Sequence, residues 1–204
     1  MGRVATPPDR DDGVMEHRTT EQLAAGLDEI RRSPTDRGSV ALIVRRPAVD
    51  AREVLDEGEL DLTAGLVGDT WSARRSRETA DGSPHPERQL NIMNARAAAL
   101  IAGSIERWPL AGDQLFVDLH LGADELPPGT RLRLGEAVIE VTEPPHLGCA
   151  KFTQRFGLDA MRFVNSPEGK ALNLRGICAK VVVPGTIRRG DEIGRVDALT
   201  AAAG

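Results

Sequence analysis

Apolar residues along the chain gather in short runs that glycine and proline separate, which is the pattern of short β-strands. The runs that we interpret as strands are residues 39–45, 90–93, 115–119, 131–134, 137–141, 174–183 and 186–196. Many short strands with Gly/Pro turns between them are typical of a closed or nearly closed β-barrel. We therefore predict a mainly β fold with peripheral helices, of the α+β class.

The clearest local signal is a hairpin between residues 131 and 141. Gly135-Glu136 separates two alternating runs, and glycine at the first position of a two-residue turn favours a tight hairpin. In that register Leu132 faces Ile139 and Leu134 faces Ala137 on one side of the sheet. Pro184-Gly185 is a second turn of similar composition, and we expect it to direct the strand that ends at residue 183 into the run 186–196.

Three segments have helical patterns. Thr19 and Gln22 have the spacing of a capping box before a helix that extends to about Arg32. Asn94 is a suitable N-cap for an alanine-rich helix over residues 95–108. A short helix is expected over residues 149–156, and these helices would pack outside the barrel.

The ends of the chain differ in composition from its middle. Residues 1–18 are polar and charged and have little to bury, so we expect them to be disordered, with one domain over 19–197 and a tail over 198–204. No apolar run approaches the ~20 residues of a membrane span. No apolar stretch of the secretory type opens the chain, so a cytoplasmic location is expected.

Composition narrows the range of functions. The 204 residues are 40% hydrophobic, enough for a real core, and the net charge of −5 argues against binding a nucleic-acid backbone. Three of the 26 basic residues are lysines and the other 23 are arginines. Two cysteines are too few for a disulfide framework or a four-cysteine zinc site.

Cys149 is the main candidate for chemistry. It follows a strand, two prolines and a glycine, and it lies where a helix begins, so the helix dipole favours its thiolate. Lys151 and Arg155 would add positive charge nearby. The structural alternative is a small apolar residue at the end of the barrel. Cys178 lies mid-strand between Ile177 and Ala179, which favours a buried structural thiol.

The segment around Cys149, together with several others, resembles the MOSC family, a domain also found at the C-terminus of molybdenum-cofactor sulfurases. The likeness covers about residues 38–197. The segments that carry it are Gly65–Asp69, Gly112–Leu115, Leu126–Gly135 with Ala137–Pro144, Arg175–Lys180 and Gly185–Ile193. In this order they match the glycine- and aspartate-containing elements of the family, the hairpin before its cysteine, and its closing strands.

The resemblance implies a MOSC-type β-barrel with a role in molybdenum-cofactor and sulfur metabolism. Cys149 would be a persulfide acceptor or a molybdenum ligand. One alternative is a cofactor-dependent reductase of N-hydroxylated compounds, and another is a non-catalytic binding module. The implied cofactor is molybdopterin, and the implied partner is a cysteine desulfurase or a molybdoenzyme.

The resemblance also nominates residues for binding the cofactor. These are Lys151, Arg155, Arg175, Lys180, Asp69, Asn91 and Gln114, while Arg188 and Arg189 are further candidates for a phosphate. For each arginine alone, a solvated strand face is the better interpretation. Asp69 more readily forms a turn or a helix cap than a pocket carboxylate. His146 has metal-chelating spacing to Cys149, but a hydrogen bond to the turn backbone is favoured.

Pyridoxal phosphate belongs more naturally to a partner enzyme. Its chemistry needs a Schiff-base lysine beside a phosphate cup, and none of the three lysines follows such a cup. The chain also lacks the glycine-rich phosphate and dinucleotide motifs.

Overall fold

The structure is a computed structural model, and it describes residues 17–196. The segment that we predict to be disordered lies outside the described residues up to residue 16. The predicted tail, residues 198–204, lies outside them entirely.

Within residues 17–196, seven strands close a barrel in the order β11-β7-β8-β9-β5-β6-β1, and β1 pairs with β11 to complete the circle. The pair β5 and β6 is parallel, and the other barrel pairs are antiparallel. The barrel strands are β1 (Arg37–Arg45), β5 (Leu90–Asn94), β6 (Leu115–Asp118), β7 (Arg131–Leu134), β8 (Ala137–Val141), β9 (Ile177–Val183) and β11 (Glu192–Arg195). The expected mainly β barrel is confirmed.

Four shorter strands lie beside the barrel. They are β2 (Glu53–Leu55), which pairs with β1, and the three-stranded sheet of β3 (Glu57–Asp61), β4 (Gly65–Leu66) and β10 (Gly185–Arg188). The expected hairpin after Pro184 is wrong, because β10 leaves the barrel to pair with β3 and β11 then returns to close it. Strand pairing between distant segments overrides the local turn signal here.

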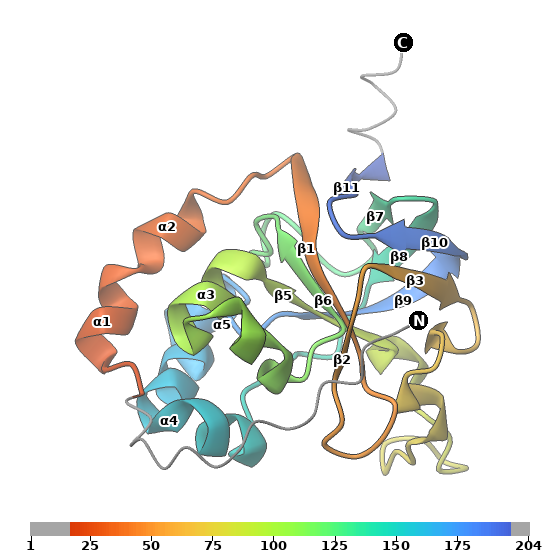
Figure 1. Ribbon diagram of the computed structural model, residues 1–204, viewed down its shortest axis with the longest axis horizontal. Coiled ribbons are helices and arrows are strands. Elements are labelled where there is room, and N and C mark those ends of the chain that lie inside the picture. The colour runs from red at the N-terminus through yellow and green to blue at the C-terminus, as the bar shows by residue number, and fades with distance from the viewer. Residues whose placement is uncertain (1–16, 197–204) are drawn as a thin grey trace.

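The helices gather on one side of the barrel (Figure 1). They are α1 (Thr20–Ala25), α2 (Leu27–Arg31), α3 (Ala95–Ala102), α4 (Ala150–Asn165) and α5 (Pro167–Ala171). The chain also forms the 3-10 turns η1 (Thr70–Ala73), η2 (Pro86–Arg88) and η3 (Ile105–Ala111). Among the described residues, no helix is both long and apolar enough to cross a bilayer.

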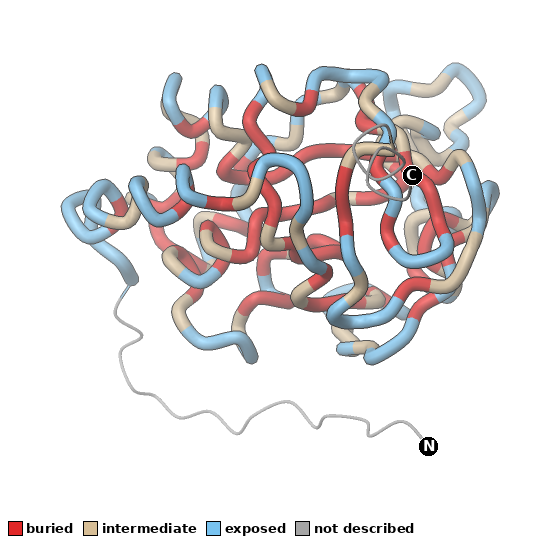
Figure 2. Tube along the Cα trace, turned by 90° about the horizontal axis from the view of Figure 1, so that it is seen from above, coloured by how far each residue is buried: buried red, intermediate tan, exposed pale blue. Residues whose placement is uncertain are grey.

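Two cores explain why the strands read as continuous apolar runs. On β1, Ile43 belongs to the core inside the barrel, whereas its neighbours Leu42 and Val44 belong to the core between the barrel and the helices. Successive side chains of a strand point to opposite faces, so a strand covered on both sides is apolar throughout. Figure 2 shows these buried stretches running through the middle of the molecule, with exposed residues along its rim.

The predicted hairpin is confirmed in its register. Leu132 pairs with Ile139 and Leu134 with Ala137, and these four side chains are fully buried in the barrel core. Gly135 has a φ of 54°, which a glycine adopts without strain.

Two predicted helices are shorter than expected. The N-terminal helix has the predicted capping box of Thr19 and Gln22, but it breaks at Gly26 into α1 and α2. A Cβ on Gly26 would collide with Leu100 of α3, so the glycine permits close packing there. The alanine-rich helix ends at Ala102, where Gly103 has a φ of 75°, and the chain continues as the 3-10 turn η3.

The segment after Cys149 forms the predicted short helix and then folds back. Gly157 interrupts α4 with a φ of 88°. A straight helix of these 16 residues would be about 24 Å long. Yet Asn165, at its far end, accepts a hydrogen bond from the backbone of Gly148 at 3.0 Å, just before its start. The chain therefore reverses direction at Gly157, and the end of α4 returns to the residues just before its start.

Candidate functional site

Cys149 is the N-cap residue of α4, and its side chain is exposed. The loop before it is fixed by Asn165, whose side-chain oxygen accepts from the Gly148 N–H and whose side-chain nitrogen donates to the Gly148 carbonyl at 3.3 Å. The thiol is thus presented to solvent from an anchored loop at the start of α4.

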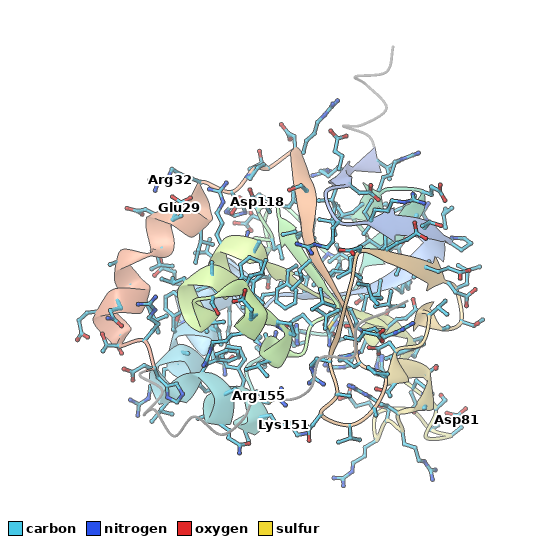
Figure 3. The ribbon with its side chains drawn as sticks, viewed as in Figure 1. Glu29, Arg32, Asp81, Asp118, Lys151 and Arg155 are labelled. Carbon is cyan, nitrogen blue, oxygen red and sulfur yellow. The ribbon has the colours of Figure 1, made fainter. Side chains whose placement is uncertain are left out.

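The positive charges beside Cys149 are partly neutralised. Asp50, in the loop between β1 and β2, binds Lys151 at 3.2 Å and Arg155 at 3.1 Å. Arg155 also donates to the carbonyl of Leu110. Figure 3 shows Lys151 and Arg155 at the start of α4 beside that loop. The two residues therefore anchor the loop, and their charge near the thiol is smaller than the sequence suggests.

Cys178 is buried, as expected. Its thiol donates to the side-chain oxygen of Asn91 at 3.6 Å, and burial raises its pKa to about 11. At neutral pH Cys178 is therefore an unreactive thiol.

A cationic cavity lies near the loop that carries Cys149. It has a volume of about 220 Å³, and we call it the arginine cavity. Its walls include Arg46, Arg74, Arg75, Arg88, Trp71, His85, Asn91 and His146, and no lining residue is acidic. A cavity with this composition attracts anions, and arginine suits phosphate in particular.

Arg46, in the wall of the arginine cavity, is paired with Asp69, which does not line the cavity. Arg46 donates from Nε and Nη2 to the two carboxylate oxygens of Asp69 at 2.8 Å each, and from Nη1 to the carbonyl of Gly112. Asp69 also caps η1 by accepting from the Trp71 N–H, which confirms the predicted cap. Burial alone would raise the pKa of Asp69, but hydrogen bonds and charge from Arg46 lower it.

Arg52 extends this positive charge towards Cys149. Burial lowers its pKa, and the charges of Arg155 and Arg46 lower it further. Burial and the charge of Arg46 lower the pKa of Arg74 in the same direction. Arginines that destabilise one another in this way are stabilised by an added anion.

Behind the cavity lies a buried group formed by Asp113, Arg175 and His146. Nη1 of Arg175 donates to both carboxylate oxygens of Asp113, at 2.7 and 3.0 Å, and its guanidinium lies 5.0 Å from the ring centre of Phe152 in α4. Nδ1 of His146 lies 3.4 Å from Asp113, so the predicted hydrogen bond of His146 to the turn backbone is wrong.

Burial sets the charge state of this group. It lowers the pKa of His146 well below the ordinary value, and the nearby charges of Arg175 and Arg46 act in the same direction. Burial raises the pKa of Asp113, whereas Arg175 stabilises its ionised form. His146 is therefore a neutral imidazole at pH 7, held beside a carboxylate that Arg175 orients.

The other predicted cofactor residues are dispersed. Asn91 lines the arginine cavity, but Gln114 joins β5 to β6 by accepting from the Asn91 N–H and donating to the carbonyl of Gln89. Three predicted cations are paired on strands away from it, Lys180 with Glu140, Arg188 with Glu57 and Arg189 with Asp56. Arg175 is buried against Asp113 and does not line the arginine cavity.

Sequence reasoning missed the residues that make this cavity. Arg46 ends an apolar strand, and Arg74, Arg75 and Arg88 lie in or beside a polar stretch that reads as an exposed loop. The feature of the sequence that could have indicated the cavity is the group of arginines at positions 74, 75 and 77. Within residues 17–196, no group of three or more His, Cys, Asp or Glu side chains could hold a metal ion.

Comparisons with known proteins agree with this architecture. A family model described as "MOSC domain" matches residues 79–194. The YuaD protein of Bacillus subtilis superimposes with a TM-score of 0.54 at 18% identity, over 77% of this chain and 94% of that one. YiiM of Escherichia coli gives 0.50 at 22% identity, over 78% and 69%. YiiM of Geobacillus stearothermophilus gives 0.53 at 13%, over 78% and 75%. No curated protein matches the sequence.

Proposed function

The chain belongs to the MOSC domain family, and from this premise we propose that it binds the molybdenum cofactor, with Cys149 as the molybdenum ligand and the arginine cavity holding the phosphate. The observation that carries the proposal is the cationic cavity, which no acidic residue lines. His146 lies in its wall, three residues before Cys149. Three residues span about 10 Å at most, so the thiol lies within reach of a ligand in the cavity.

The residues present fit such a cofactor. A thiolate is a soft ligand suited to molybdenum, and arginines bind phosphate oxygens in pairs. Nε of Arg88, in the wall of the cavity, is buried without a partner among the described residues, and an anion would supply one. A volume of about 220 Å³ holds the phosphate and its neighbouring atoms, and the remainder would extend over the surface towards Cys149.

This arrangement assigns distinct roles to the chain and to the cofactor. The cofactor would supply two-electron redox chemistry, as in a reductase of N-hydroxylated compounds. Arg46 and Arg74 would orient its anionic end, and Asp69 would keep Arg46 in place. The contact of Asn165 with Gly148 would hold the loop that presents the sulfur of Cys149.

The exposure of Cys149 favours a second function, persulfide transfer. Because the thiol does not line the arginine cavity, a donor protein can approach it. The Cys149 thiolate would attack the outer sulfur of a donor persulfide. The donor S–S bond breaks, a new one forms on Cys149, and the donor leaves as a thiolate. A pyridoxal-phosphate-dependent cysteine desulfurase is the proposed donor.

Metal and pterin analysis tests the first function. The protein would be purified from a host that makes the cofactor, and molybdenum and released pterin would be measured. We expect Cys149→Ser to lose molybdenum and the double variant Arg74→Gln/Arg75→Gln to lose pterin. Arg188→Gln, which removes an arginine paired with Glu57 away from the cavity, should retain both. Wild-type protein without either component would refute cofactor binding.

Mass spectrometry tests the second function. After incubation with a cysteine desulfurase and cysteine, Cys149 should gain about 32 Da, the mass of one sulfur atom. The Cys149→Ser variant should gain nothing. If neither experiment shows loading on Cys149, the chain is a non-catalytic binding module.

A further inference from the structure

A second cavity lies on another side of His146. It has a volume of about 270 Å³ and lies between the loop before Cys149 and the helices α4 and α5. Its lining includes His146, Leu147, Val164, Lys170, Asn173 and Arg175. We call it the α4–α5 cavity. His146 lines both this cavity and the arginine cavity.

The charge of the α4–α5 cavity is positive. None of its lining residues is acidic, and Lys170 has no ion-pair partner among residues 17–196. Asp113 lies behind the wall, and its carboxylate is bound by Arg175. No carboxylate among the described residues pairs with Lys170, which favours an anionic ligand at this cavity.

Arg175 lines the α4–α5 cavity, and one of its hydrogen-bond donors is unpaired. It is 5% exposed, and its terminal nitrogens donate to Asp113 and to the carbonyl of Ala111. Its Nε has no acceptor among the described residues. An unpaired buried donor is destabilising, so an acceptor oxygen that reaches it would be stabilising.

Part of the cavity lining is apolar. Leu147 and Val164 line it together with Pro145. The volume is slightly below the usual range of about 300–1,000 Å³ for small-molecule sites, so the cavity suits a compact molecule. A lining that combines apolar and cationic side chains matches an organic anion better than an inorganic one.

We propose that the α4–α5 cavity binds a small organic carboxylate, with the carboxylate beside Lys170 and Arg175 and the apolar part against Leu147 and Val164. The site is separate from the arginine cavity, and it places its ligand against His146, three residues from Cys149. The proposal goes beyond cofactor binding and does not depend on it.

Titration of the ¹⁵N-labelled full chain with benzoate tests this proposal without any cofactor. We expect saturable chemical-shift changes at the backbone amides of Gly169, Lys170 and Asn173. Benzamide, which has the same shape without the charge, should produce none. Lys170→Gln should weaken benzoate binding about tenfold, because a charged partner is lost. Lys180→Gln, at a lysine paired with Glu140, should bind as the wild type does.

Three results would overturn the proposal. They are no saturable change at these amides, an equal response to benzamide, or changes confined to Arg74 and Ser76 in the arginine cavity. Failure here is distinguishable from failure of the proposed function, since molybdenum and pterin content are measured separately. The Lys170→Gln variant should keep the molybdenum content of the wild type.

Discussion

Arg46 and Asp69 join two separate segments through a pair of hydrogen bonds of 2.8 Å each. Arg46 follows the last residue of β1, and Asp69 precedes η1. Both side chains are almost completely buried. The pair therefore fixes the loop that carries Trp71 and Arg74 against the barrel, and the arginine cavity depends on it.

We expect Asp69→Asn to lower the free energy of unfolding by about 3 kcal/mol, because it leaves Arg46 buried without a counter-charge. Urea denaturation would measure the loss. Asp56→Asn, at a side chain that is 95% exposed, should change stability by less than about 0.5 kcal/mol. Equal effects of the two substitutions would contradict a structural role for the Arg46–Asp69 pair.

His146 should make stability depend on pH. Its folded pKa lies well below the ordinary value of 6.5, so the unfolded chain binds more protons than the folded one as pH falls below 6.5. The stability present above pH 6.5 is then lost towards lower pH, by at most about 1.4 kcal/mol per pH unit. His146→Gln should show a shallower slope between pH 7 and pH 5.5 in urea denaturation. Parallel slopes would mean that His146 titrates normally.

The two cysteines should differ in reactivity. Cys149 is exposed, whereas Cys178 is buried with a pKa raised to about 11. Brief treatment with iodoacetamide should alkylate Cys149, and Cys178 should react only after denaturation. Peptide mass spectrometry would separate the two sites. Rapid alkylation of Cys178 in the native protein would show that its strand opens.

The contact between Gly26 and Leu100 can be tested by a double-mutant cycle. Gly26→Ala should destabilise the protein by about 1–3 kcal/mol, because the new methyl group overpacks the contact with Leu100. In a Leu100→Ala background the same substitution should cost little. Thermal unfolding of the four proteins would give the coupling energy between the two positions. If the effects of the two substitutions are additive, the destabilisation by Gly26→Ala does not arise from contact with Leu100.

Local patterns predicted the barrel and its hairpin well. The alternation around Gly135 determines which residues of β7 and β8 face inward, so the register of Leu132 with Ile139 follows from the sequence alone. The capping box of Thr19 and the helix start after Cys149 are local in the same way. The limits of the helices were less predictable, because the break at Gly26 reflects packing against Leu100.

The site was less predictable because its parts are distant in sequence. The arginine cavity combines the end of β1, the loop after Asp69 and Arg88, and only barrel closure brings them together. For the same reason Lys180 and Arg188, which read as candidate anion ligands, prove to be paired with carboxylates on neighbouring strands.

The bend in α4 has a consequence for how the thiol is placed. Asn165, which lies beyond the bend, forms hydrogen bonds with the backbone of Gly148. The position of the adjacent Cys149 therefore depends on the far half of α4 as well as on the barrel strand before it. Gly157 forms the bend between the two halves of α4, and its φ of 88° is unfavourable for a residue with a side chain. A substitution that changes the backbone conformation at position 157 would thus change the direction of the Cys149 side chain, eight residues earlier, without moving any strand.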